Sequence, residues 1–240
     1  MKERELTSYT WLILDADGTL LDFRRSEAAA LDKTPAQMGL QVPGDFCDTY
    51  HSINDSLWRE FEAGVLRAHE VRTKRFMRVF EELGIAGDSN VFSEAFLKNV
   101  IQESTFIDGA ESLLARLKNR IGLVLLTNGF ADVQRARIAQ LGLGDTFDHV
   151  IISEEVGVAK PERAIFEIVF ERIGRPNKAN VLIVGDSLSS DIRGGSEYGI
   201  DTCWFNTDQR TNATAIEPTY EIGHLNEVAE LLFRAEANHE

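Results

Sequence analysis

Two patterns of apolar residues alternate along most of the chain. Near the N-terminus, and again from Phe106 onward, short runs of consecutive apolar residues are separated by segments in which apolar residues recur at every third or fourth position. Consecutive apolar runs are typical of strands buried on both faces, and the wider spacing is typical of amphipathic helices. Strands separated by helices predict right-handed crossovers, and therefore an α/β unit with a parallel sheet and helices on both of its faces.

The expected strands of this unit lie at 11–14, 121–126, 150–153, 181–184 and 202–205. The expected helices lie at 109–119, 131–141, 164–173, 191–198 and 225–236. The carboxyl ends of parallel strands meet at one edge of the sheet, and ligands bind at that edge in such folds. Polar residues that directly follow the strands are therefore the candidates for chemistry.

The stretch from about Arg24 to Glu103 shows only the helical pattern. One apolar face is formed by residues three or four positions apart, namely Phe46, Tyr50, Ile53, Leu57 and Phe61. Similar faces around Phe76 and Phe92, together with a shorter segment at 26–38, predict three or four helices that pack as a small bundle.

The seams between the two patterns give the expected domains. Residues 1–22 and 106–240 are expected to form the α/β core, and residues 23–105 are expected to form an inserted helical domain. The chain leaves the core directly after the first strand and returns before the second. The insertion is therefore expected to lie over the carboxyl ends of the strands and to act as a lid.

The composition restricts the partners. The chain carries 39 acidic and 25 basic residues, a formal net charge of −14, which repels phosphate backbones and anionic lipids. A nucleic-acid polymer or a membrane is therefore not expected as a partner, whereas a small anionic substrate is compatible with a local cation. Cys47 and Cys203 indicate neither a disulfide framework nor a metal site. Without a signal-peptide pattern or a membrane-length apolar run, a cytoplasmic protein is expected.

The first candidate pair is Asp15 and Asp17, which follow the strand at 11–14 in the stretch DADGT. If the chain stays locally extended there, both carboxylates face the same space. An ionised aspartate can attack phosphorus to form an aspartyl-phosphate, and a second carboxyl can protonate the leaving oxygen and later activate water. The alternative is an Asp-Gly turn that only ends the strand.

A phosphate-binding loop is expected after the strand at 121–126. The Thr127 hydroxyl and the backbone N–H groups of Asn128 and Gly129 precede the helix at 131–141 and can bind a phosphate group there. The alternative is a threonine or asparagine that only caps the helix.

Lys160 is the candidate cation. It precedes Pro161, which fixes the start of the next expected helix. A lysine held there can bridge the nucleophile and a phosphate group. The alternative is a solvated lysine, since lysine is seldom buried without a partner.

A candidate metal site involves Asp186, which follows the strand at 181–184 after one glycine. Mg²⁺ prefers carboxylate, carbonyl and water oxygens, so Asp15, the backbone carbonyl of Asp17 and Asp186 can provide its ligands. Asp191 can hold a metal-bound water or orient Lys160. The alternative for Asp191 is an N-cap.

These motifs resemble those of the haloacid dehalogenase superfamily of phosphohydrolases. In chain order they are DADGT at 15–19, Thr127-Asn128, Lys160-Pro161 and Gly185-Asp186 through Asp191. The resemblance covers nearly the whole chain. It implies a Rossmann-like core with strand order 5-4-1-2-3, a helical cap inserted after the first motif, and dependence on Mg²⁺. It also implies the roles already considered for the residues of these motifs.

The chain is most similar to the pyrimidine 5′-nucleotidase branch of the superfamily, through TNGF at 127–130, SEEVGVAKP at 153–161 and Leu57-Trp58 in the expected cap. That branch hydrolyses nucleoside monophosphates such as UMP, dUMP and dTMP. In the cap, Trp58 can stack on a base, and His51, Asn54 or Arg75 can reach a sugar or a base edge. The alternatives are core packing for Trp58 and a solvated helix face for Arg75.

The sequence therefore predicts a Mg²⁺-dependent nucleoside 5′-monophosphatase that works as a monomer or small homo-oligomer. The alternatives are a sugar-phosphate phosphatase or phosphomutase with the same core, a 2-haloacid dehalogenase, and a non-catalytic binding module. The dehalogenases of the superfamily usually lack the second carboxylate, so Asp17 favours phosphoryl chemistry. The full set of catalytic positions argues against a binding module.

Overall fold

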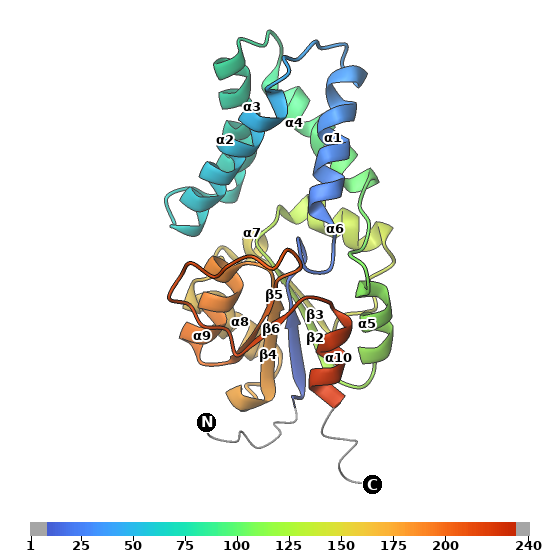
Figure 1. The fold of residues 1–240 in the computed structure, drawn as a ribbon, viewed down its shortest axis with the longest axis vertical. Helices are drawn as coiled ribbons and strands as arrows, with labels where there is room; N and C mark the ends of the chain where they lie inside the picture. The colour runs from blue at the N-terminus through green and yellow to red at the C-terminus, as the bar shows by residue number, and fades with distance from the viewer. Residues whose placement is uncertain (1–8, 234–240) are drawn as a thin grey trace. The chain divides into compact units, whose positions relative to one another are not determined.

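The computed structural model describes residues 9–233 and contains a sheet of six parallel strands (Figure 1). The strands are β1 Trp11–Leu14, β2 Gly122–Thr127, β3 His149–Ile152, β4 Val181–Gly185, β5 Asp201–Phe205 and β6 Tyr220–Ile222. Their order is β3-β2-β1-β4-β5-β6, so the predicted order of the first five strands and the Rossmann-like α/β class are confirmed. The sequence pattern does not predict β6, because its three residues are too few to show a strand period.

The central strand β1 fixes where the first candidate residues emerge. Leu14, its last residue, pairs in register with Leu125 of β2 and with Val184 of β4. The last three residues of β1 are fully buried, as a strand covered on both faces requires. Asp15 therefore emerges between the carboxyl ends of two neighbouring strands.

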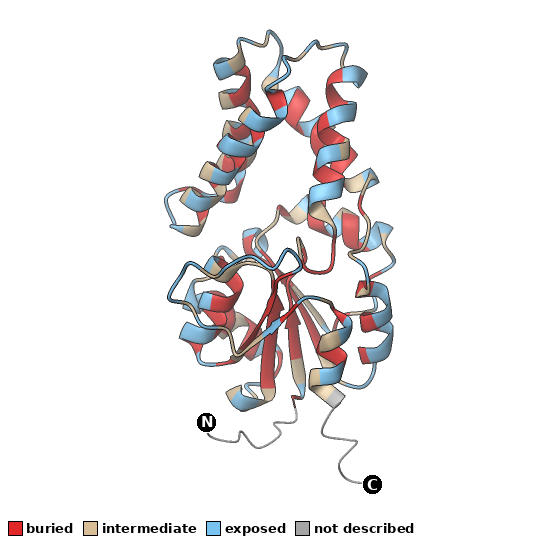
Figure 2. Ribbon diagram, viewed as in Figure 1, coloured by how far each residue is buried: buried red, intermediate tan, exposed pale blue. Residues whose placement is uncertain are grey.

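Helices cover both faces of this sheet. On one face α8 Arg163–Arg172 packs with α9 Arg193–Tyr198, and on the other α5 Ala110–Leu117 packs with α10 Asn226–Phe233 (Figure 1). The buried residues follow the strands and the inner sides of these helices (Figure 2). One cluster of buried residues includes Ile13, Val124, Ile151, Ile165, Phe166, Val169 and Ile183. We call this body, formed by residues 9–22, 106–128 and 142–233, the α/β unit.

Two local details differ from the sequence prediction, and a third is only partly described. A short helix, α7 Ser153–Val156, follows β3 directly. The helix expected at 191–198 is preceded by a wider π turn, Leu188–Ile192, which contains Asp191. The closing helix expected at 225–236 is α10, and the end of that predicted range, after residue 233, lies outside the described residues.

Residues 23–105 and 129–141 form a second body, which we call the helical unit. Its helices are α1 Phe23–Gln37, α2 Phe46–Glu62, α3 Ala68–Leu83, α4 Ser89–Gln102 and α6 Ala131–Gln140. Helix α1 packs on α4, α2 on α3, α3 on α4, and α4 on α6. The chain passes into this unit after residues 22 and 128 and out of it after residues 105 and 141. Helix α6, expected in the α/β core, groups with the helical unit because it packs on α4. In the described part of the chain, no helix has the length and apolar character needed to span a membrane.

A polar cluster is buried inside the helical unit. The Tyr50 hydroxyl donates to the Glu27 carboxylate over 2.7 Å, and Arg75 Nη1 donates to the Asn54 side-chain oxygen over 3.2 Å and to the Tyr50 hydroxyl over 3.4 Å. Arg75 is only 1% exposed and Asn54 6%, so the solvated face considered for Arg75 is wrong. Burial raises the pKa of Glu27 above its ordinary value, and the Tyr50 hydroxyl and the Arg75 charge oppose that rise.

This cluster predicts that Arg75 stabilises the helical unit by neutralising Glu27. Arg75→Met should lower the free energy of unfolding by about 3 kcal/mol, because the buried Glu27 loses the favourable charge of Arg75 and keeps only the Tyr50 hydroxyl and, at 3.5 Å, His51 as partners. Adding Glu27→Gln to Arg75→Met should recover at least half of that loss, because the uncompensated charge is then removed. Urea unfolding at neutral pH measures both changes.

Arg78→Met is the matched control, because Arg78 lies on the same helix but pairs with Glu60 at the surface over 3.5 Å. Surface pairs contribute little, so the control should stay within about 0.5 kcal/mol of the natural chain. If the double variant proves no more stable than Arg75→Met, Arg75 does not neutralise Glu27.

Candidate active site

Asp15 directly follows β1, and its side chain is buried at the carboxyl edge of the sheet. Its backbone N–H donates to the Val184 carbonyl over 3.0 Å, so the pairing with β4 extends to this residue. One carboxylate oxygen accepts from the Lys160 ammonium over 2.6 Å, and the other accepts from the Thr19 hydroxyl over 3.2 Å. Both oxygens of Asp15 are therefore held by groups of the α/β unit.

The Lys160 ammonium, 2% exposed, donates to three oxygens. They are Asp15 Oδ1 at 2.6 Å, Asp191 Oδ1 at 2.7 Å and the Leu126 carbonyl at 2.8 Å. The Asn128 side chain holds the lysine backbone through two 2.9 Å bonds, donating to its carbonyl and accepting from its N–H. Burial alone would lower the pKa of Lys160, but the two carboxylates outweigh it and raise that pKa. Lys160 is thus a permanent buried cation, and the solvated alternative is wrong.

Asp191 acts on Lys160 from the π turn after β4. Its Oδ1 accepts from the ammonium, and its Oδ2 accepts from the Ser187 backbone N–H over 3.2 Å. The cap of this turn is the hydroxyl of Ser187, which accepts from the Ser190 N–H. Asp191 therefore orients Lys160, one of its two predicted roles, and the N-cap alternative is wrong.

Hydrogen bonds to its backbone N–H and to its backbone carbonyl hold Asp186 in place. Its N–H donates to the Thr19 hydroxyl oxygen over 3.1 Å, while its carbonyl accepts from Trp204 Nε1 at 3.0 Å and from Arg210 Nη2 at 2.9 Å. The Thr19 hydroxyl, which donates to Asp15, therefore joins the ends of β1 and β4 through one oxygen atom.

The sequence analysis does not predict the roles of Trp204 and Arg210. Both lie in or after β5, whose carboxyl end meets the same edge, so the parallel-sheet rule points to this region. The rule does not identify Arg210 itself, because Arg210 lies in the loop after β5 and reaches Asp186 only where the Asn206 side chain holds its backbone. The Asn206 side chain donates to the Arg210 carbonyl over 3.0 Å and accepts from its N–H over 2.9 Å.

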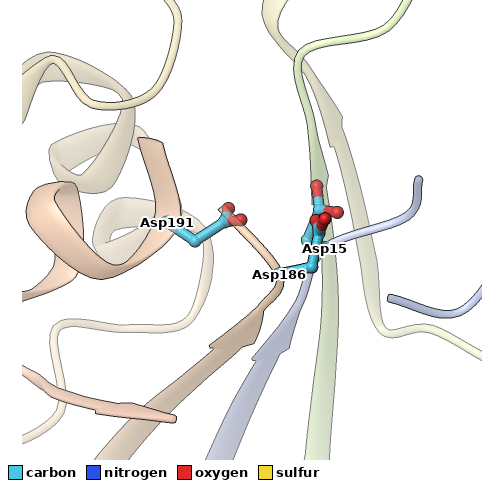
Figure 3. Close-up of side chains that lie close together, drawn as sticks. All are labelled: Asp15, Asp186 and Asp191. Atoms are coloured by element: carbon cyan, nitrogen blue, oxygen red, sulfur yellow. The ribbon is translucent and has the colours of Figure 1, made fainter. Parts of the chain in front are cut away.

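Three carboxylates cluster at this edge. Asp15, Asp186 and Asp191 each bring one oxygen within 4.8 Å of the others (Figure 3). Burial raises the pKa of Asp15 well above its ordinary value, Lys160 opposes that rise, and the charges of Asp191 and Asp186 add to it. Burial and the charge of Asp191 raise the pKa of Asp186 to about 7. The protein's own groups therefore leave an excess of negative charge here.

The cluster fits a divalent cation. All three side chains are carboxylates, the hard oxygen ligands that Mg²⁺ and Ca²⁺ prefer. A cation neutralises the negative charge of Asp191, which adds to the effect of burial in raising the pKa of Asp186. Gly18 adopts a φ of +81°, and a Cβ there would lie 2.7 Å from Asp186 Oδ2. Only glycine lets this turn approach the carboxylate so closely.

Asp17 is partly exposed just beyond this cluster. Its backbone bridges to Leu21, and the Gly18 N–H donates to the Leu21 carbonyl over 3.0 Å, which closes the turn. The charge of Asp17 adds to the rise in the pKa of Asp186. The clustered oxygens do not include the Asp17 carboxylate, and metal binding through its backbone carbonyl stays a prediction.

The expected phosphate loop is divided between the two bodies. Thr127, the buried last residue of β2, and Asn128 belong to the α/β unit and lie at the edge that carries Asp15. The Asn128 side chain is bound to the Lys160 backbone, so the predicted phosphate donor on this residue is its backbone N–H. Gly129 is the first residue of the second segment of the helical unit.

The remaining predicted contacts lie in the helical unit. Trp58 is half-buried, and its ring centroid lies 5.6 Å from that of Phe130 and 5.3 Å from that of Phe61, so it takes part in core packing. Asn54 and Arg75 belong to the buried polar cluster. Contacts of these side chains with a substrate stay predictions.

Comparison with known proteins identifies relatives over almost the full length. Residues 9–199 match the family model described as haloacid dehalogenase-like hydrolase. The chain is 37% identical to the HAD-hydrolase YfnB of Bacillus subtilis, over 93% of this chain and 95% of that protein. A crystal structure of YfnB bound to magnesium, which reveals interdomain movement in that protein, superimposes with a TM-score of 0.86 over 93% of this chain and 98% of that one.

Two further relatives have named activities. The chain is 34% identical to the pyrimidine 5′-nucleotidase YjjG of Escherichia coli, over 93% of this chain and 98% of that protein. It is also 34% identical to the pyrimidine 5′-nucleotidase PynA of Streptococcus pneumoniae, over 89% of this chain and 91% of that protein.

The carboxylate cluster predicts a pH-dependent cation affinity. Because the pKa of Asp186 is about 7 in the folded protein, a proton competes with the cation below that pH. The dissociation constant for Mg²⁺, measured by calorimetry, should fall about tenfold for each unit of pH rise below about 7 and level off above it. Asp186→Asn should weaken this dependence, leaving the part due to Asp15, and should remove most of the affinity. Asp145→Asn, at an exposed position, should change neither.

Stability should follow the same titration. The folded protein keeps a proton on Asp186 at pH values where the unfolded chain has lost it, so ionisation destabilises the metal-free protein as the pH rises from about 4 through about 7. The increase in melting temperature caused by Mg²⁺ should therefore grow across that window. An increase of equal size at all these pH values would contradict the assignment of Asp186 as a ligand.

Proposed function

Because the chain belongs to the haloacid dehalogenase-like hydrolases, we propose that it is a Mg²⁺-dependent phosphomonoesterase that carries the phosphoryl group on Asp15. One observation carries the proposal. A buried aspartate at the end of β1 has one oxygen 2.6 Å from the Lys160 ammonium and shares a carboxylate cluster with Asp186. A carboxylate nucleophile, a fixed cation and cation ligands are the parts that phosphoryl transfer to a protein side chain requires.

In the first half-reaction, a carboxylate oxygen of Asp15 attacks phosphorus. The oxygen–phosphorus bond to Asp15 forms as the bond to the leaving oxygen breaks, and Asp17 supplies the proton that the leaving oxygen needs. Lys160 and the Thr127 hydroxyl face the negative charge of the phosphoryl oxygens. A Mg²⁺ bound by Asp15 and Asp186, with Asp191 near them, supplies further charge neutralisation.

In the second half-reaction, a water molecule takes the place of the leaving alcohol. Asp17, now ionised, accepts a proton from this water as its oxygen attacks phosphorus, and the bond to Asp15 breaks. Inorganic phosphate leaves, and both aspartates return to their starting protonation states. The Lys160 ammonium keeps its proton throughout, because the raised pKa makes it a poor acid.

The substrate class that we propose is the nucleoside 5′-monophosphates, with pyrimidine bases preferred. Support comes from YjjG and PynA, two relatives of almost equal length named as pyrimidine 5′-nucleotidases. The half-buried Trp58 offers an aromatic face on which a base can stack. The acidic net charge of −14, with basic groups gathered locally at Lys160 and Arg210, suits a small phosphate ester rather than a nucleic-acid polymer.

Asp15→Asn should abolish the phosphatase activity. The amide has the shape of the carboxylate but is no nucleophile, so kcat should fall by about 10⁴-fold or more, as for other covalent nucleophiles. Asp17→Asn should lower kcat about 10²-fold to 10⁴-fold, the range of a lost general acid and base. Phosphate release measured with saturating Mg²⁺ gives both values, and Asp145→Asn is the control. An Asp15→Asn protein that keeps its activity would exclude the proposed nucleophile.

A substrate panel tests the proposed class. With Mg²⁺, the protein should release phosphate from UMP, dUMP and dTMP with a higher kcat/KM than from sugar phosphates. Turnover of sugar phosphates without turnover of the nucleotides would contradict the nucleotide assignment and leave the phosphatase chemistry standing. Halide release from 2-haloacids without Mg²⁺ would overturn both.

A further inference from the structure

The polypeptide passes between the two bodies at four places, after residues 22, 105, 128 and 141. Three of these passages are contacted by two buried polar side chains of α6, Gln134 and Arg137. Helix α6 itself begins three residues after Asn128, the loop residue whose side chain holds the Lys160 backbone.

Arg137 holds both ends of the helical insertion. It is 0% exposed, and its Nε donates to the Ser104 hydroxyl oxygen over 2.8 Å, just after the end of α4. Its guanidinium carbon lies 5.7 Å from the centre of the Phe23 ring, at the start of α1. Ser104 in turn donates to the Val100 carbonyl over 2.8 Å, so the seam at 105 is fixed to both α4 and α6. One guanidinium therefore contacts the entry and the exit of the insertion.

Gln134 continues this contact to the phosphate loop. It is 1% exposed, and its side-chain oxygen accepts from Arg137 Nη1 over 3.3 Å. Its side-chain amide lies very close to the backbone of Gly129: a Cβ on residue 129 would be only 2.2 Å from Gln134 Nε2. Residue 129 must therefore be glycine while Gln134 keeps this place, and the last residue of the predicted phosphate loop rests on the side chain that Arg137 holds.

Ordinary helix packing does not require these groups. Apolar side chains at positions 134 and 137 would fill the space between α6 and α4 without the cost of burying an amide and a guanidinium. A guanidinium differs in carrying several donors in a rigid plane, so it can hold separate segments in one fixed geometry. Such a group can hold in position the segments that it joins.

We propose that Gln134 and Arg137 are positioning residues that couple the phosphate loop to the two ends of the helical insertion. Occupation of the loop by a phosphoryl group then stiffens the segments around residues 23 and 104. The proposal rests on the proposed function only for the ligand of the loop. The coupling itself runs through the contacts of Gly129, Gln134, Arg137 and Ser104.

Hydrogen–deuterium exchange of the full chain, with and without inorganic phosphate in the presence of Mg²⁺, tests the coupling. In the natural chain, phosphate should slow exchange at least about fivefold in peptides covering 127–131 and also in peptides covering 20–25 and 102–107. In Arg137→Lys the slowing should persist at 127–131 and be lost in the other two segments. Ser104→Ala, a milder change that removes one partner of Arg137, should reduce the slowing at 102–107.

Arg135→Lys, at an exposed position of the same helix, is the control and should behave like the natural chain. Urea unfolding of each variant distinguishes the proposed coupling from a purely structural role of the residue. A purely structural role would lower the urea midpoint of unfolding but leave the phosphate-dependent slowing of exchange in all three segments. That result, or slowing confined to 127–131 in the natural chain, would overturn the inference. The absence of slowing at 127–131 in the natural chain would instead count against the proposed phosphate site.

Discussion

The arrangement of the α/β unit depends on one buried ammonium group. Lys160 donates to the carboxylates of Asp15 and Asp191 and to the carbonyl of Leu126, and these acceptors come from the end of β1, the turn after β4 and β2. The ion pairs bring the ends of separate strands to one point, and the Asn128 side chain fixes the backbone of the lysine itself. A lysine buried without such partners would lose its charge or unfold its surroundings, so the carboxylates and the cation require each other.

The charges at this point do not balance, and the imbalance gives the site its chemistry. Three carboxylates gather around one buried ammonium, and burial together with the charge of Asp191 raises the pKa of Asp186 to about 7, although Arg210 and Lys160 oppose that rise. A fold optimised only for stability would avoid such a cluster, since like charges in a buried place weaken the folded state. The parallel sheet makes the cluster possible, because its well-packed strands end together and fix acidic residues that would otherwise repel one another. A divalent cation relieves this repulsion.

The sequence predicts the parts of the structure that follow from simple periodicity. The apolar runs identify five strands, and the polar residues directly after them identify Asp15, Thr127 and Asp186 at one edge. What sequence periodicity leaves out depends on long-range geometry. The Thr19 hydroxyl joins two strand ends, and Arg210 returns to Asp186 from a loop, through hydrogen bonds between side chains and distant backbone groups that no local pattern encodes. Similarly, the sequence pattern of α6 is that of an ordinary crossover helix between two strands, and only the packing of α6 on α4 assigns it to the helical unit.

The central claim is that Asp15 carries the phosphoryl group during turnover. The direct test is to mix the protein with Mg²⁺ and a nucleoside monophosphate, quench the mixture in acid during turnover and map the phosphoryl group by peptide mass spectrometry. We expect an acid-stable, base-labile phosphoryl group on the peptide that contains Asp15, absent from Asp15→Asn protein treated in the same way. Turnover of the same substrate with no phosphorylated peptide, or with the phosphoryl group on a different residue, would contradict the account.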